Sequence, residues 1–315
     1  MTYDFLVAGF PKCGTTTFHN LLKQNLQIYL PECKETFYFS KLPLYKKGEK
    51  YLERNFYGKV LRGQKIGGVE PSFAKYARRV KTAIGENTKI IFLIRNPIDY
   101  LFSFYKMCMS FGSIEWYKAY RTYGGFSEII KAYLKDENGF VRLNEENAAI
   151  ASAIKGGMYI KYIRTYAKMT DSKNIKIILF ENFVRNETEV INDIFDFIGV
   201  KQKKVNLRVG ENKSEAIMPK NEIGRWLLEK REYLHHTYIE HRKDINRIGM
   251  GLCELYYKYI PKISSKHIEE QIDKTTRELL YGYYDQSVKE LQVMTKLNLM
   301  EEWDWNIGSG SSLAK

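Results

Sequence analysis

The chain has 315 residues, which allows one large domain or two ordinary ones. Apolar residues make up 44% of it and charged residues 28%, a balance that excludes disorder for the bulk of the chain. Fifty Lys and Arg against thirty-seven Asp and Glu leave a net charge of +13, which indicates an anionic partner without saying which kind.

The cellular setting is suggested by several missing signals. No apolar window approaches the roughly eighteen residues that a spanning helix needs, so we expect no membrane span. The N-terminus lacks the basic and apolar regions of a signal peptide, which makes a cytoplasmic location the expectation. Four scattered cysteines, Cys13, Cys33, Cys108 and Cys253, fit a reducing compartment, and without a C-x-x-C pair we expect no metal.

Three continuous apolar segments predict strands, each followed by a helical pattern. They span residues 4–9, 89–94 and 175–180, and the helix after the third is expected to stop at Gly199. Continuous rather than alternating apolar strands favour a parallel sheet covered on both faces. We therefore expect an α/β, P-loop-like three-layer fold with a central parallel sheet flanked by helices and a helical C-terminal part. The boundaries would be one domain over 1–307 and a flexible, linker-like tail over 308–315.

The loop after the first strand reads GFPKCGTT over residues 9–16, the frame of a phosphate-binding loop. Thr15 stands where the usual lysine is expected, and the cation is Lys12 instead. Backbone N–H groups near Gly14 and the following helix terminus can cradle a phosphate, with hydroxyls from Thr15, Thr16 and Thr17. The alternative is an ordinary strand-to-helix turn.

The segment FPKCGTTTF closely resembles the 5′-phosphosulfate loop of sulfotransferases that use 3′-phosphoadenosine 5′-phosphosulfate (PAPS). A second segment, IRNPIDYLFSFYK, resembles the family's other signature, whose arginine and serine clasp the 3′-phosphate of the donor. The resemblance implies that Arg95 and Ser103 bind that phosphate and that Lys12 stabilises charge on the leaving phosphate. It also implies donor contacts from a larger set: Pro11, Lys12, Cys13, Gly14, Thr15, Thr16, Thr17, Tyr159, Asn212 and Lys213.

The segment PECKETFYF resembles the K-E-x-x-F-F stretch of heparan-type glycan sulfotransferases, whose glutamate takes the proton of the acceptor hydroxyl. This implies that Glu35 is the catalytic base, with Lys34 as a nearby cation. The family's E-K-T-P stretch is altered here to Gly68-Val69-Glu70-Pro71, so that Val69 replaces the lysine and the acid is displaced to Glu70. Glu70 is therefore open to three interpretations: an acceptor contact, an alternative base, or a cap for a helix over 76–83. His19 is another candidate base or a structural histidine.

The acceptor is expected to be a carbohydrate, because residues 41–65 carry eight Lys or Arg against two acids, interleaved with aromatic residues. Lys46 and Lys47 belong to this stretch, and the alternative is a solvated face. Sulfuryl transfer from PAPS to a glycan hydroxyl, with no nucleic acid as partner, is the function that the sequence favours. The rivals are a P-loop kinase, which lacks its lysine here, and a polyanion-binding protein without catalysis.

Overall fold

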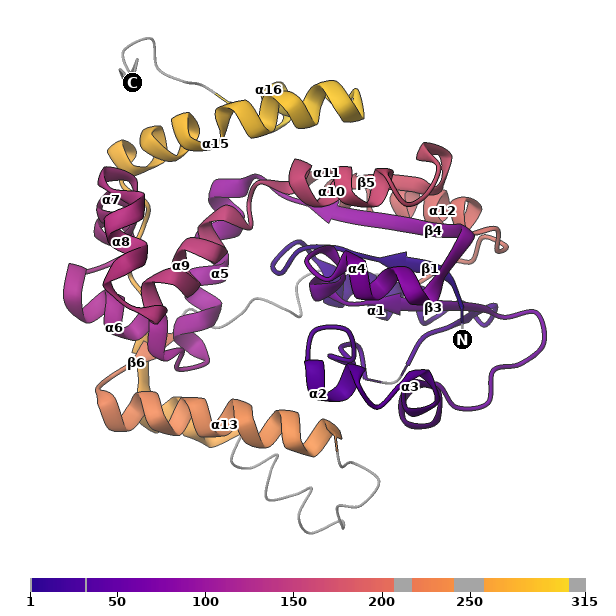
Figure 1. The fold of residues 1–315 in the computed structure, drawn as a ribbon, viewed down its shortest axis with the longest axis horizontal. Helices are drawn as coiled ribbons and strands as arrows, with labels where there is room; N and C mark the ends of the chain where they lie inside the picture. The colour runs from indigo at the N-terminus through magenta and orange to yellow at the C-terminus, as the bar shows by residue number, and fades with distance from the viewer. Residues whose placement is uncertain (1, 32, 207–216, 241–257, 306–315) are drawn as a thin grey trace. The chain divides into compact units, whose positions relative to one another are not determined.

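The computed structural model describes residues 2–31, 33–206, 217–240 and 258–305 (Figure 1). They belong to two compact units, which are described separately. The first unit comprises Met1–Tyr100, Met158–Asn212 and Ser287–Asp304, and the second comprises the rest of the chain. The expected single domain over 1–307 stays a prediction, and the expected tail over 308–315 lies outside the described residues.

A parallel sheet of five strands forms the centre of the first unit, in the order β2-β3-β1-β4-β5 (Figure 1). Leu6 of β1 pairs with Gly68 on one side and Ile90 on the other. The central strands are buried, as their continuous apolar sequence requires. The strands span Tyr3–Val7 (β1), Ile28–Tyr29 (β2), Lys65–Val69 (β3), Ile84–Ile94 (β4) and Ile175–Leu179 (β5).

Helices cover both faces of this sheet. The connection from β1 to β2 runs toward one edge of the sheet, and the connection from β4 to β5 runs toward the other edge. Because crossovers between parallel strands are right-handed, α1 and α10 lie on opposite faces of the sheet. On one face, Phe18 of α1 contacts Phe183 of α11 at a ring distance of 5.4 Å, and on the other Phe92 of β4 contacts Tyr166 of α10 at 5.3 Å. The helices of this unit are α1 (Thr15–Leu22), α2 (Leu42–Tyr45), α3 (Glu49–Phe56), η1 (Pro71–Ala74), α4 (Ala77–Val80), η2 (Lys81–Ala83), α10 (Tyr159–Ala167), η3 (Ser172–Asn174), α11 (Phe180–Arg185), α12 (Glu187–Ile198) and α16 (Leu299–Glu302).

The second unit is mainly helical. Glu270 joins two of its helices, since its carboxylate accepts hydrogen bonds from Tyr105 Oη at 2.9 Å and from the Phe126 backbone N–H at 2.8 Å. Its elements are α6 (Ile114–Tyr123), α7 (Phe126–Lys135), α8 (Glu137–Leu143), α9 (Glu145–Lys155), α13 (Glu222–Glu240) and the antiparallel pair β6 (Ile217–Pro219) and β7 (Ser265–His267). Helices α5 (Pro97–Ser110) and α15 (Lys274–Thr295) belong partly to each unit.

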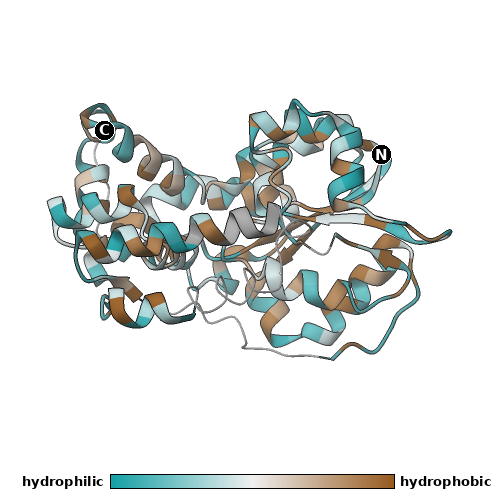
Figure 2. Cartoon of the chain, turned by 90° about the horizontal axis from the view of Figure 1, so that it is seen from below, coloured by the Kyte–Doolittle hydropathy of each residue, from teal (hydrophilic) through white to brown (hydrophobic). Residues whose placement is uncertain are grey.

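The α/β prediction is confirmed: the chain has a central parallel sheet, flanking helices and a helical C-terminal part. Figure 2 shows the contrast behind the prediction, with apolar strands in the sheet and helices of mixed hydropathy around it. Gly199 ends α12 in the left-handed conformation at φ 79°, as expected. The helix expected over 76–83 is found as the short α4, preceded by Tyr76 as N-cap and continued to Ala83 by one turn of 3₁₀ helix.

Candidate functional site

The loop between β1 and α1 forms the first part of the candidate site. Gly14 caps α1 with φ 84°, and a Cβ atom there would lie 3.0 Å from Phe180 Cδ2. Only glycine meets both demands without strain. Lys12 also has a left-handed backbone, at φ 65°, which is uncommon outside glycine and occurs where a loop is held for function.

The N-terminus of α1 points its first backbone N–H groups out of the helix, where they have no intrahelical partner. No described side chain caps this terminus, and its first turn contains no acid. Thr15 is buried at 4% exposure, whereas Thr16 is exposed and Thr17 half-buried. The helix dipole and these donors suit a phosphate, as the glycine frame predicts.

Arg95 follows β4 and reaches the tip of this loop. Its Nη1 donates to the Lys12 carbonyl oxygen at 3.3 Å, and its guanidinium lies 4.8 Å above the ring of Phe180, the first residue of α11. The carboxyl ends of β1, β4 and β5 therefore meet at Arg95. Arginine presents five N–H donors in a planar fork, which suits recognition of a phosphate beside the loop.

Glu181 supports the Arg95 segment from behind and was not found from the sequence. It accepts hydrogen bonds from the Asn96 backbone N–H at 2.9 Å and from Trp303 Nε1 at 3.1 Å. Asn96 in turn caps α5 through Oδ1, which accepts from the Ile98 N–H at 2.9 Å. Its position in the sequence could have indicated a role, because Glu181 comes just after β5 as Arg95 comes just after β4.

Two residues of the expected donor set lie beneath the loop. Cys13 is buried, and desolvation raises the pKa of its thiol far above its usual range. Tyr159 is also buried, with its ring 4.4 Å from that of Phe10. Both side chains support the loop, and their direct contact with a donor stays a prediction.

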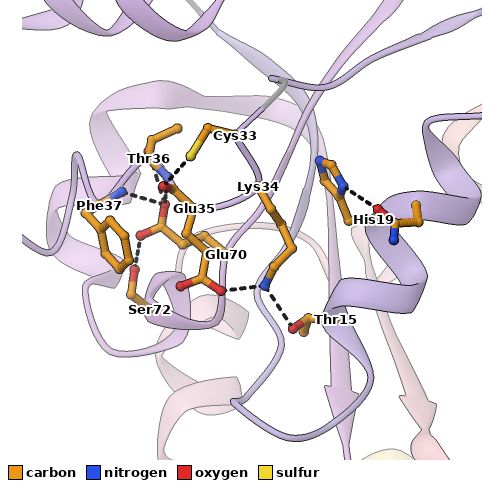
Figure 3. A network of polar contacts seen from close by, with 10 residues as sticks. Thr15, His19, Cys33, Lys34, Glu35, Thr36, Phe37, Glu70 and Ser72 are labelled. Carbon is orange, nitrogen blue, oxygen red and sulfur yellow. Dashed lines mark hydrogen bonds and ion pairs between the residues drawn. The ribbon is translucent and has the colours of Figure 1, made fainter. Parts of the chain in front are cut away.

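Lys34 and Glu35 lie beside the loop, on the segment between β2 and α2 (Figure 3). Lys34 Nζ is 2.5 Å from Glu35 Oε1 and 3.4 Å from Thr15 Oγ1. The Glu35 side chain is 33% exposed, so its carboxylate combines a cationic neighbour with access to solvent. The expected base and the expected phosphate loop are thus brought together within one unit.

Glu70 lies behind Glu35 and is only 1% exposed. Its carboxylate binds Ser72 Oγ and the backbone of the segment after Glu35, as Figure 3 shows. Burial raises the pKa of the carboxyl to about 7, the Ser72 hydrogen bond lowers it, and the nearby Glu35 charge raises it. The residue at the N-cap of α4 is Tyr76, and Glu70 gives no side-chain cap even to the preceding η1, so the helix-cap interpretation is not what the structure shows.

His19 has a structural environment. It is 3% exposed, and its Nε2 lies 3.3 Å from the Pro31 carbonyl oxygen, which can only accept a hydrogen bond. Burial lowers the pKa of the ring. These contacts tie α1 to the segment that leads to Lys34, and they favour the structural interpretation over that of a base.

The basic stretch over 41–65 divides into exposed and buried parts. Lys46 and Lys47 are exposed, and Lys47 Nζ lies 4.4 Å above the Tyr51 ring. Tyr57 is 5% exposed and packs on Tyr3, so it belongs to the core. Arg79, which lies outside this stretch, donates through Nη1 to the Phe39 carbonyl oxygen at 2.7 Å and supports the segment that follows Glu35.

For three residues of the expected donor set, a role in this arrangement stays a prediction. Ser103 lies on α5 within the second unit, whereas Arg95 belongs to the first, so their joint role stays a prediction. Asn212 and Lys213 lie outside the described residues. Among the residues that the structure describes, there is no group of three or more His, Cys, Asp or Glu side chains that could hold a metal ion. No helix in the described ranges is long and apolar enough to cross a membrane.

Comparison with known proteins identifies the family. The chain matches the family described as "Sulfotransferase domain" over residues 2–283, and it belongs to that family. It is similar to Sulfotransferase 6B1 of Homo sapiens and of Gorilla gorilla gorilla, with 21% identity over 198 residues. That match covers 62% of this chain and 55% of each relative, so the chain matches only about half the length of these proteins.

A solved structure supports the fold. A sulfotransferase from Alicyclobacillus acidocaldarius superposes with a TM-score of 0.59 at 19% identity, covering 96% of this chain and 99% of that one. The likeness extends over both compact units of the chain. At this level of identity it concerns the fold.

The buried Glu70 predicts a pH dependence of stability. Its pKa in the folded chain, about 7, exceeds the ordinary value of 4.5, so folding is favoured while Glu70 is protonated. The free energy of unfolding should therefore fall as the pH rises from about 4.5 to 7. Glu70→Gln should remove this contribution, and the variant should gain stability relative to wild type between pH 5 and 8. Urea denaturation across that range measures the difference, and identical pH profiles would contradict the prediction.

Proposed function

We propose that this protein transfers a sulfuryl group from PAPS to an acceptor hydroxyl. The observation that carries the proposal is the convergence of Lys34, Glu35 and Thr15 at the N-terminus of α1. A phosphate-binding terminus, a cation and an accessible carboxylate within hydrogen-bond reach are the parts that such a transfer needs. Membership of the sulfotransferase family gives independent support.

The residues of the loop fit the 5′-phosphate side of the donor. When bound, the donor supplies the activated sulfuryl group and a leaving phosphate. The N–H groups at Thr15, Thr16 and Thr17 and the positive end of the α1 dipole would hold that phosphate. Lys12 would stabilise its charge from the loop tip, and Arg95, already bonded to the Lys12 carbonyl, would bind the 3′-phosphate. The resemblance adds Ser103 to this second role.

Glu35 would accept the proton of the acceptor hydroxyl. Transfer of this kind should resemble phosphoryl transfer, in which positioning and charge stabilisation dominate. Lys34 holds the Glu35 carboxylate next to Thr15, which keeps the base beside the donor loop. The partial exposure of Glu35 leaves it open to a hydroxyl from solvent or from an acceptor.

The proposed acceptor is a carbohydrate with acidic groups. The support is the exposed cationic part of residues 41–65, with Lys46 and Lys47 beside half-buried Tyr45 and Tyr51. Lysines can pair with carboxylates or sulfates of a glycan, and aromatic rings can stack on sugar faces. This charge exceeds what donor binding requires, since the donor residues lie in other segments of the chain.

Donor recognition can be tested by thermal shift. Adenosine 3′,5′-bisphosphate should raise the melting temperature, whereas adenosine 5′-phosphate should do little, because only the first offers Arg95 a 3′-phosphate. Arg95→Ala should weaken binding of the bisphosphate by about 2 kcal/mol or more, measured by calorimetry. Arg164→Ala, at an exposed ion pair with Glu290, is the matched control. Equal stabilisation by the two nucleotides would remove the assignment of Arg95.

The role of Glu35 can be tested by Glu35→Gln, which keeps the shape of the side chain and removes the base. Turnover should fall by about 10²- to 10⁴-fold while affinity for adenosine 3′,5′-bisphosphate stays near wild type. Glu189→Gln, at an exposed carboxylate on α12, should leave turnover unchanged. A Glu35→Gln enzyme with the wild-type rate would show that the base lies elsewhere.

The nature of the acceptor can be tested with salt. Raising the ionic strength from about 0.05 to 0.2 M should increase the KM for an acidic glycan, because exposed charges are screened over about 10 Å at 0.1 M. Lys46→Glu with Lys47→Glu should raise that KM and spare the donor's, whereas Lys168→Glu, outside the stretch, should change neither. An acceptor KM insensitive to salt, or preference for a neutral phenol over every glycan, would contradict the carbohydrate assignment.

A further inference from the structure

We propose that Glu70 is a positioning residue that holds the segment carrying Glu35 in its active geometry. The inference rests on the proposed function, because it concerns the base of that reaction. It differs from a second catalytic carboxylate: Glu70 would act through the backbone that follows Glu35 and would not touch the acceptor.

Both oxygens of Glu70 are occupied by donors from the protein. Oε2 accepts from the Thr36 N–H at 3.0 Å, from Thr36 Oγ1 at 3.1 Å and from the Phe37 N–H at 3.2 Å. Oε1 accepts from Ser72 Oγ. The side chain is almost fully buried, so it faces this turn and not the solvent. A carboxylate that binds consecutive amides fixes the direction of the chain at that point.

The turn that Glu70 binds needs such support. Phe37 has φ 53°, the left-handed conformation, which is strained for a bulky residue and rarely adopted by one. Its N–H is bound by Glu70, and its carbonyl oxygen accepts from the Lys41 N–H at 2.9 Å and from Ser40 Oγ at 3.1 Å. Without the carboxylate, the first of these anchors is lost and the strained turn is free to relax.

Relaxation of this turn would move Glu35, which directly precedes Thr36. The Glu35 carboxylate lies beside Lys34, which also contacts Thr15 at the donor loop, so its position depends on the path of the backbone. A displacement of about 1 Å at a reacting group can cost about 10²-fold in rate. Glu70 thus links the end of β3 to the base through two backbone N–H groups.

An amide can replace the carboxylate in this role but not in that of a base. In Glu70→Gln, the side-chain oxygen could accept from Thr36 and Phe37 as Oε2 does, and the side-chain NH₂ group could donate to Ser72, whose hydroxyl both donates and accepts. Alanine offers none of these contacts. The pair Glu70→Ala and Glu70→Gln therefore separates anchoring from proton transfer.

The experiment compares wild type, Glu70→Ala, Glu70→Gln and the control Glu187→Ala, which removes another buried carboxylate at the start of α12. We expect kcat to fall about 10- to 100-fold in Glu70→Ala and to stay within about threefold of wild type in Glu70→Gln and in the control. Affinity for adenosine 3′,5′-bisphosphate should be retained in all four. Hydrogen exchange of the Thr36 and Phe37 amides, followed by mass spectrometry, should accelerate in Glu70→Ala alone.

Three results would overturn the proposal. The first is an equal loss of kcat in Glu70→Ala and Glu70→Gln with unchanged hydrogen exchange, which would make Glu70 a base. The others are a wild-type kcat in Glu70→Ala, or wild-type hydrogen exchange in Glu70→Ala. If Glu70→Ala does not fold, Thr36→Val replaces it, and faster exchange at Phe37 with lower kcat is required. If the wild type transfers no sulfuryl group, the proposed function fails by itself, and the exchange rates still decide whether Glu70 anchors the turn.

Discussion

The reversal of the strand order between the parallel neighbours β1 and β4, in a sheet buried on both faces, is the constraint on which the site depends. The chain leaves these neighbouring strands in opposite directions, so the connections diverge beyond their carboxyl ends, which is where open α/β sheets generally bind ligands. The loop after β1 and Arg95 after β4 both lie at this edge, joined by the bond from Arg95 to the Lys12 carbonyl oxygen. The fold thus brings together the two segments that we propose to bind the phosphates of the donor.

Two carboxylates near the ends of other strands support segments of the site, one the segment that carries Glu35 and the other the segment that carries Arg95. Glu70, after β3, binds the backbone behind Glu35, and Glu181, after β5, binds the backbone behind Arg95. A buried N–H without a partner is costly, so irregular segments at a sheet edge need acceptors from elsewhere in the fold. In this chain, Glu70 is an acid that its sequence position makes a catalytic candidate, yet its carboxylate binds backbone N–H groups.

The electrostatics of the site differ from those of the remaining surface. The cations close to the candidate loop, Lys12, Lys34 and Arg95, are half-buried, and partial removal from water strengthens their interaction with an anion. Lys46 and Lys47 are exposed, and their effect on an acceptor would be long-range and sensitive to salt. The net charge of +13 therefore includes half-buried cations that act on an anion at short range and exposed cations whose effect is long-range and screened by salt.

The sequence by itself determined strands β1, β4 and β5, the loop before α1 and the strand-end position of Arg95, because continuous apolar runs and glycine frames are local patterns. It also indicated Glu35 through its motif. It did not indicate β2 and β3, which are too short or too rich in glycine to show such a run. Only the tertiary structure decided that Glu70, His19 and Tyr57 are buried. Glu70 binds residues more than thirty positions away, and the partner of Asn96 is Glu181, 85 positions along the chain. Burial and pairing depend on which distant segments meet, and this information is absent from any local pattern of residues.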